Sequence, residues 1–137
     1  MVFRVSALCG LLLSALPAAA DVFTFETPSG NIDCVVGVGG DSSDITCTIY
    51  ERSGPPARPR PGSCRGTWGH SFEMFSRGAV RMICDGPLRN GSAQEIAPYG
   101  VTGAPGGFEC TSERTGLTCR NEDGHGFFLS RRAQRVF

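Results

Sequence analysis

"NIDCVVGVGGDSSDITCTI", residues 31–49, decides the fold, because it has the pattern of two antiparallel strands closed by a disulfide. Pairing Cys34 with Cys47 places Gly40 and Asp41 at a two-residue turn, and both residue types are common in such turns. The same register divides the side chains between two faces, with Ile32, Val36, Ile45 and Ile49 on one and Asp33, Val35, Thr46 and Thr48 on the other. One face is apolar and the other mostly polar, which indicates a hairpin buried on one side.

The segment "GFECTSERTGLTCRN", residues 107–121, has a similar pattern. Pairing Cys110 with Cys119 leaves a four-residue loop from Glu113 to Gly116, with glycine at its last position. We therefore expect a second hairpin closed by a disulfide.

A third hairpin is expected in "HSFEMFSRGAVRMIC", residues 70–84. A three-residue loop of Ser76, Arg77 and Gly78 would place glycine at the bulge position. It predicts three cross-strand pairs, namely Phe72 with Met82, Met74 with Val80, and Glu73 with Arg81.

Few segments have helical periodicity, whereas several alternate with a period of two and are separated by turn-forming residues. This pattern predicts an all-β fold, a small disulfide-stapled antiparallel sandwich or partly closed barrel built from hairpins. Helical structure is expected at most as a short turn in residues 91–97.

Six of the seven cysteines follow residue 20, and an even number in a small exported chain is typical of disulfides. The hairpin registers account for four of them, and elimination pairs the other two. The expected disulfides are Cys34–Cys47, Cys64–Cys84 and Cys110–Cys119. A zinc site is the alternative, but there is no C-x-x-C and the two histidines lie far apart in the sequence. We predict neither a metal site nor a cofactor.

The N-terminal stretch "MVFRVSALCGLLLSALPAAA", residues 1–20, has the pattern of a signal peptide cleaved before Asp21. It combines Arg4, an apolar run and a small-residue end, and the run is shorter than the roughly 20 residues that span a bilayer. Residues 21–137 are therefore expected to form a single disulfide-rich β-domain in the periplasm or outside the cell, with no stable membrane span after cleavage.

Charge is unevenly distributed. Residues 21–51 carry six acidic residues and no arginine, whereas residues 52–89 carry seven arginines and two acidic residues. Lysine is absent, and the arginine fork suits carboxylate or phosphate partners, although arginines also serve as ordinary soluble surface. The formal net charge is zero and no nucleic-acid module is recognisable, so we do not predict nucleic-acid binding.

The short segment "TPSG", residues 27–30, predicts a type I turn, with Pro28 at its second position and Gly30 at its fourth. We expect a structural role, in which the turn leads into the first disulfide hairpin. A binding role for this exposed turn is the alternative.

The segments "FETPSGNIDC", "TWGHSFEM", "APYGVTG", "GGFECTSERTGLTCRN" and "GHGFFLSR" together resemble a family of small exported bacterial domains of unknown function. The resemblance covers roughly residues 23 to 131, from an F-x-[ST]-P-S-G-N-I-x-C start to a G-H-G-F-x-L-S end. It implies an exported, cysteine-containing domain and transfers no catalytic residue. The stretch "RSGPPARPRPGS", residues 52–63, has no counterpart in this resemblance, so its path is left open.

Four aromatic or histidine side chains in glycine-containing loops, Trp68, His70, Tyr99 and His125, are the candidate binding residues. We expect them to line one exposed recognition patch for an unidentified protein or envelope ligand, because loops on a rigid sheet commonly carry binding. Alternatively, His125 is a turn residue that packs or caps a backbone group. No catalytic residue is assigned, since no nucleophile motif is present. The alternatives to a binding module are a small hydrolase-type enzyme using His70 and His125, and a structural envelope protein.

Overall fold

The structure is a computed structural model that describes residues 21–86 and 93–137. The predicted signal peptide, residues 1–20, lies outside the described residues. Within them the chain forms strands and one 3-10 turn, and no α-helix is present. The elements are β1 (Asp21–Glu26), β2 (Ile32–Val38), β3 (Ser43–Ile49), β4 (Ser71–Phe75), β5 (Arg81–Ile83), β6 (Glu95–Ile96), β7 (Val101–Gly103), η1 (Pro105–Gly107), β8 (Glu109–Glu113), β9 (Gly116–Arg120), β10 (Gly126–Leu129) and β11 (Gln134–Val136).

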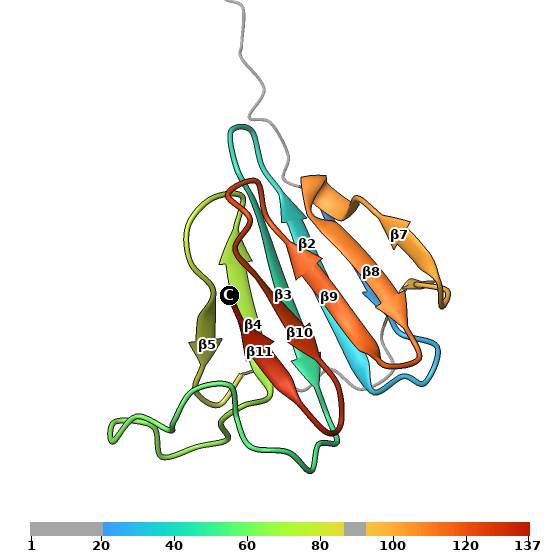
Figure 1. Cartoon of the computed structure of the whole chain (residues 1–137). Helices are drawn as coiled ribbons and strands as arrows, with labels where there is room; N and C mark the ends of the chain where they lie inside the picture. Colours follow the sequence, from blue (N-terminus) through green and yellow to red (C-terminus); the bar gives the residue numbers. More distant parts are fainter. Residues whose placement is uncertain (1–20, 87–92) are drawn as a thin grey trace, which may run out of the picture.

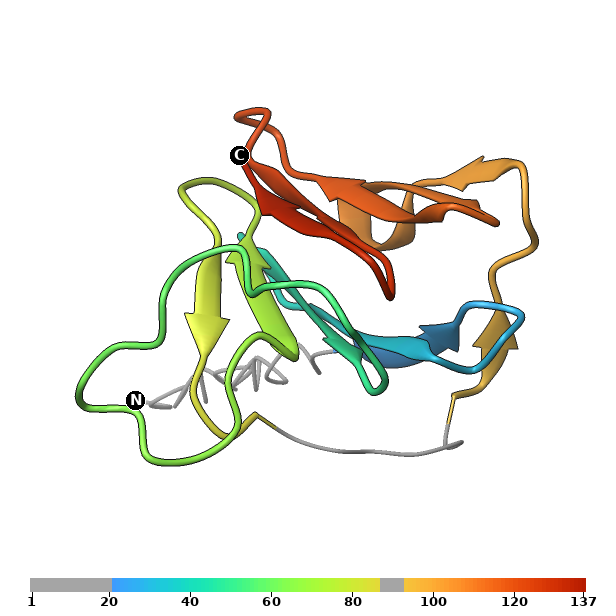
Figure 2. The same ribbon diagram turned by 60° about the horizontal axis from the view of Figure 1, so that its bottom comes forward.

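The described strands make two sheets that lie face to face as two layers (Figures 1 and 2). The first sheet has six strands in the order β5-β4-β3-β2-β1-β6, and the second has five in the order β11-β10-β9-β8-β7. Neighbouring strands are antiparallel, except that β6 runs parallel to β1. The predicted all-β fold is confirmed, and of its two forms the chain adopts the open sandwich rather than a barrel.

The first predicted hairpin is confirmed in its full register. Strands β2 and β3 pair Ile32 with Ile49 and Cys34 with Cys47, and the N–H of Gly39 donates to the carbonyl of Ser42 around the turn. All three disulfides join the expected cysteines, Cys34–Cys47, Cys64–Cys84 and Cys110–Cys119.

The second hairpin has the expected register but a shorter loop. Strands β8 and β9 still pair Glu113 with Gly116, so only Arg114 and Thr115 lie in the turn, rather than the four residues expected. Gly116 has a φ of 147°, and a Cβ atom there would lie 2.5 Å from the carbonyl oxygen of Leu129. Glycine thus belongs to the strand, where the neighbouring backbone approaches closely.

The third hairpin is correct only in its lower part. Strands β4 and β5 pair Phe72 with Met82 and Glu73 with Arg81, and the last two side chains form an ion pair at 3.8 Å. The strand pairing ends at Glu73 and Arg81, so Met74 and Val80 are not part of the ladder, although both are buried in the core. Beyond it the loop is bonded by Asn121 of the β9–β10 connection, which donates to the carbonyls of Phe75 and Gly78.

The expectation of a helical turn in residues 91–97 is also wrong where the structure describes it. Glu95 and Ile96 form strand β6, which pairs with Phe25 and Glu26 of β1. Residues 91 and 92 lie outside the described residues. Pairing with an open strand edge thus overrides the weak local preference for a helix.

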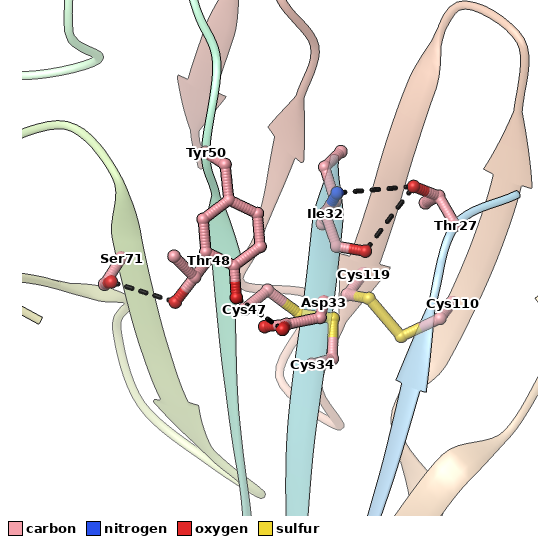
Figure 3. Close-up of a disulfide and its surroundings, with 10 residues drawn as sticks. All are labelled: Thr27, Ile32, Asp33, Cys34, Cys47, Thr48, Tyr50, Ser71, Cys110 and Cys119. Carbon is pink, nitrogen blue, oxygen red and sulfur yellow. Dashed lines mark hydrogen bonds between the residues drawn. A yellow bond between two sulfur atoms is a disulfide. The ribbon is translucent and has the colours of Figure 1, made fainter. Parts of the chain in front are cut away.

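The core lies between the sheets and is built from the inward positions of the hairpins. Phe72 of β4 meets Phe127 of β10 with ring centroids 5.8 Å apart, which joins the two layers directly. The Cys34–Cys47 and Cys110–Cys119 disulfides belong to the same buried cluster, one from each sheet (Figure 3). The disulfides therefore occupy places in the core as well as closing loops.

The outward face of the six-stranded sheet carries a buried polar row rather than a solvated one. Asp33, Thr48 and Ser71 lie opposite one another on β2, β3 and β4, and each is less than 5% exposed. The Thr48 and Ser71 hydroxyls are hydrogen-bonded at 3.0 Å, and the Tyr50 hydroxyl donates to Asp33 (Figure 3). These contacts satisfy the polar atoms that burial would otherwise leave unpaired.

The path of residues 52–63, left open by the sequence, begins at the tip of the β10–β11 hairpin. The N–H groups of Ser53 and Gly54 both donate to the carbonyl of Arg131, and Glu51 forms an ion pair with the Arg131 side chain. Figure 2 shows the loop continuing around one side of the sandwich.

Candidate functional site

Trp68 and His70 lie together just before β4, and both are held by backbone groups. The indole N–H of Trp68 donates to the carbonyl of Arg58 at 2.8 Å, and the tryptophan is only 9% exposed. The Nδ1 atom of His70 donates to the carbonyl of Ile49 at 2.7 Å. Through these contacts the two side chains anchor the loop that precedes β4.

His125 lies at the opposite end of β4 from His70. It belongs to the β9–β10 loop, where its backbone N–H donates to Asn121 Oδ1, and Asn121 in turn bonds the loop that follows β4. Strand β4 itself spans roughly 16 Å at about 3.3 Å per residue. The structure therefore does not bring His70 and His125 together.

Tyr99 lies in a third place, beside the tip of the β8–β9 hairpin. The guanidinium carbon of Arg114 is 5.0 Å from the centre of the tyrosine ring, a cation–π contact. Tyr99 is half-buried and lines a cleft that neither Trp68, His70 nor His125 lines. The four predicted residues are thus spread over separate parts of the described sandwich.

The cleft that contains Tyr99 has a volume of about 560 Å³ and lies at one end of the sandwich. Three turns from both sheets form its walls, namely residues 27–30 after β1, the β8–β9 tip and the β10–β11 tip. These turns gather at the lower end of the molecule in Figure 1. The cleft is a product of sheet packing, since its walls are far apart in the sequence.

The turn on one wall of this cleft has the predicted form. The N–H of Gly30 donates to the carbonyl of Thr27 at 2.8 Å, which closes the turn with Pro28 at its second position. Among the described residues other than glycine only Asp85 has a positive φ, so Ser29 does not have the conformation of a type II turn. The Thr27 and Ser29 side chains supply hydroxyl groups to the cleft wall.

Arginine provides the charge of the cleft. Arg114, Arg131 and Arg132 line it, together with one carboxylate, Glu113. Arg131 is paired with Glu51, which lies outside the lining. Within the described part of the chain, Arg114 makes only the cation–π contact with Tyr99, and Arg132 has no side-chain ion pair or hydrogen bond. Two exposed guanidinium groups therefore face the cleft with their donors free.

The described residues contain no group of three or more His, Cys, Asp or Glu side chains that could hold a metal ion. Asp123, the acid nearest to His125 in the sequence, accepts from the backbone of Gly78 and pairs with Arg77. No helix in residues 21–86 or 93–137 is long and apolar enough to cross a membrane.

Sequence reasoning missed the arginines of the cleft. Arg114 was recognisable as a loop residue of the second hairpin, and "SRRA", residues 130–133, has the length of a tight connection between strands. The sequence signal that points to them is the presence of arginines at the tips of two hairpins, Arg114 in one and Arg131 and Arg132 in the other. What the sequence lacks is the order of strands that places both tips beside Tyr99.

One protein family, described as a family of unknown function (DUF6636), has a model that matches residues 6–137 of the chain. The match spans nearly the whole sequence and confirms the expectation that the chain belongs to a family of unknown function. No curated protein and no solved structure matches the chain.

Proposed function

The chain belongs to this family of unknown function, and we propose that it is a non-catalytic binding module, acting outside the cytoplasm, whose end cleft takes a small anionic ligand. The observation that carries this proposal is the pair of arginines, Arg114 and Arg132, that face one cleft without ion-pair partners among the described residues. A guanidinium group binds carboxylate or phosphate through two parallel hydrogen bonds.

The other groups of the cleft support a polar, oriented ligand. The side chains of Ser29, Thr115 and Ser130 line it, and their hydroxyl oxygens, already hydrogen-bonded within the chain, can still accept from a ligand that carries hydroxyls of its own. Tyr99 holds Arg114 by the ring contact, so this arginine loses less freedom on binding than a mobile side chain would. The ligand we propose is therefore a hydroxylated acid, such as a sugar acid.

Action outside the cytoplasm is supported by two independent features. The N-terminal 20 residues have the composition of a cleaved signal peptide. Three disulfides in a chain of 137 residues are typical of compartments where thiols are oxidised.

The catalytic alternative lacks the geometry it needs. A hydrolase that used both histidines would require His70, His125 and an acid to converge, but the histidines lie at opposite ends of β4 and His70 is bonded to a backbone carbonyl. No contact in the described residues favours a structural envelope role over binding.

An NMR titration of the oxidised protein tests the proposal, with galacturonate and inorganic phosphate as probes and galactose as the neutral control. We expect galacturonate to shift the amide signals of residues 113–116 and 130–132, with phosphate weaker and galactose inactive. Arg114→Gln and Arg132→Gln should each weaken galacturonate binding by about tenfold, since a charge-assisted hydrogen bond contributes about 1.5 kcal/mol or more.

Arg65→Gln is the matched control, because Arg65 is exposed, has no side-chain partner in the described residues and does not line the cleft. The affinity of this variant for galacturonate should equal that of the wild type. Equal binding of galactose and galacturonate would refute the anionic character of the site. Shifts confined to residues away from the three turns would refute its position.

A further inference from the structure

The outward face of β9, β10 and β11 carries two aromatic rings that each lie over a glycine. A Cβ atom on Gly116 would be 2.6 Å from Cε2 of Phe128, and one on Gly126 would be 3.0 Å from Cε2 of Phe137. Both rings therefore need the bare backbone beneath them. The edge of each ring thus lies against the backbone of the neighbouring strand.

The guanidinium group of an arginine lies over each ring. The guanidinium carbon of Arg135 is 5.1 Å from the centre of the Phe128 ring, and that of Arg120 is 4.9 Å from the centre of the Phe137 ring. Both arginines are exposed and neither forms an ion pair within the described residues. Their charges are thus held in place by stacking, while their N–H groups are left for a ligand.

The two stacked arginines share one shallow hollow. Arg120, Arg135 and Phe137 line a depression of about 400 Å³, with the Thr118 hydroxyl and Gln134 in its wall. Thr118 lies opposite Thr111 on β8, which in turn lies opposite Thr102 on β7. The hydroxyls of Thr102 and Thr111 are hydrogen-bonded at 2.8 Å. The face therefore offers fixed cations beside hydroxyl groups.

A chain of contacts leads from this hollow to the end cleft, and the two depressions share no lining residue. Gly116 lines the cleft, the Phe128 ring lies over Gly116, and Arg135 stacks on Phe128 and lines the hollow. Arginine side chains therefore lie both in the cleft, at Arg132, and on the outward face of the sheet, at Arg135 and Arg120. A ligand longer than one acidic unit can contact both places at once.

We infer that the ligand is a chain of acidic sugars, an anionic polysaccharide that extends from the end cleft across the stacked arginines of β9–β11. This inference rests on the proposed function, since the cleft is its first subsite. Cation spacing along a flat face suits carboxylates repeated along a chain, and the threonine hydroxyls suit the sugar hydroxyls between them.

A nucleic acid fits this face less well. A guanidinium group lies over each ring, so a base that stacked there would have to compete with the arginine.

The test measures the affinity of the oxidised protein for galacturonate and for oligogalacturonates of about three and ten units, in which length raises the number of subsites engaged. We expect the dissociation constant to fall at least tenfold from the monomer to the longest chain. Arg120→Gln and Arg135→Gln should each weaken binding of the longest chain three- to tenfold and leave monomer binding unchanged. Arg114→Gln should weaken both.

Phe128→Leu separates stacking from charge, because it keeps every cation and removes the surface that holds Arg135. It should weaken binding of the longest chain two- to fivefold, and an unchanged affinity would show that stacking plays no part. If the monomer binds but length brings no gain, the extended site is wrong and the proposed function stands. If neither binds, both are wrong. An oligonucleotide of equal charge that binds as tightly would overturn the assignment to a polysaccharide.

Discussion

The side-chain amide of Asn121 ties the two sheets together at the end of the sandwich opposite the cleft, and replacing it tests how much one buried group contributes. Its Nδ2 atom donates to the carbonyls of Phe75 and Gly78 at 3.0 and 2.8 Å. Its Oδ1 atom accepts from the N–H groups of Asp123 and His125 at 3.1 and 3.0 Å. The residue is 8% exposed, so few water molecules can replace these partners.

The magnitude follows from the number of bonds. Asn121→Ala removes all four, and at about 1 kcal/mol each we expect the free energy of unfolding to fall by about 4 kcal/mol. Asn121→Asp keeps the two bonds to N–H groups but points a carboxylate at the two carbonyls. At neutral pH this variant should therefore lose as much unfolding free energy as Asn121→Ala. It keeps two bonds, but the buried carboxylate is repelled by the two carbonyls and has lost its water shell.

Acid separates the two variants. Burial and the facing carbonyls disfavour the charged form and raise the pKa of the introduced carboxyl above its ordinary value of about 3.9. A raised pKa in the folded state gives stability that is present below the unfolded value and lost as pH rises through the folded value. The deficit of Asn121→Asp against wild type should thus be at least about 1 kcal/mol smaller at pH 4 than at pH 8.

Urea unfolding followed by the fluorescence of Trp68, the single tryptophan of the chain, measures these deficits. The wild type at the same pH is the reference, so titration of other groups cancels. Asn121→Ala serves as the control, with a deficit that does not change with pH. An aspartate deficit that is equal at both pH values, or an alanine deficit below about 1 kcal/mol, would refute the role assigned to this amide.

Three other outcomes are expected from the contacts of the core. Tyr50→Phe removes the hydroxyl that donates to buried Asp33 and should lower the free energy of unfolding by about 1–3 kcal/mol in urea titrations, whereas no change would mean that water replaces the bond. The double variant Cys110→Ala and Cys119→Ala should cost about 3 kcal/mol from loop closure and more from its buried sulfurs, and a cost below about 2 kcal/mol would contradict their place in the core. Reduction and alkylation of all three disulfides should abolish near-UV circular dichroism, and a retained spectrum would show that the sheets hold without them.

The sequence predicted those parts of the fold that depend on local register. In a hairpin, the turn residues fix which residues face each other, so Cys34 and Cys47 could be paired from spacing alone. The ladder of the third hairpin stops short of Met74 and Val80, and the loop beyond is bonded by Asn121 of the β9–β10 connection. Local chemistry accounts for one of the four Asn121 contacts, since asparagine commonly bonds the backbone N–H two residues on, here that of Asp123. The two contacts to Phe75 and Gly78 depend on packing against the other sheet.

The candidate site could not be predicted, because its walls meet only through strand order. Tyr99, Arg114 and Arg132 lie on three connections that share no sequence pattern, and they become neighbours when β8, β9 and β10 pair side by side. The prediction placed Trp68 beside Tyr99 on the ground that both are aromatic residues in loops. In the structure the indole N–H of Trp68 donates to the carbonyl of Arg58, and Trp68 does not line the cleft that contains Tyr99.

The disulfides connect the stability of this fold with the compartment in which it can work. Their cysteines are 13, 20 and 9 residues apart in the sequence, and loops of such lengths contribute about 3 kcal/mol each, or about 9 kcal/mol together. That sum is comparable to the whole stability of a typical domain, about 5–15 kcal/mol. Two of the bridges also fill the centre of the core, where reduction would leave polar thiols in place of a sulfur–sulfur contact. A reducing compartment would therefore remove a stabilisation comparable to that of the whole domain, although each bridge closes a hairpin or loop and none joins the two sheets. This dependence on oxidised cysteines is consistent with a protein that works outside the cytoplasm.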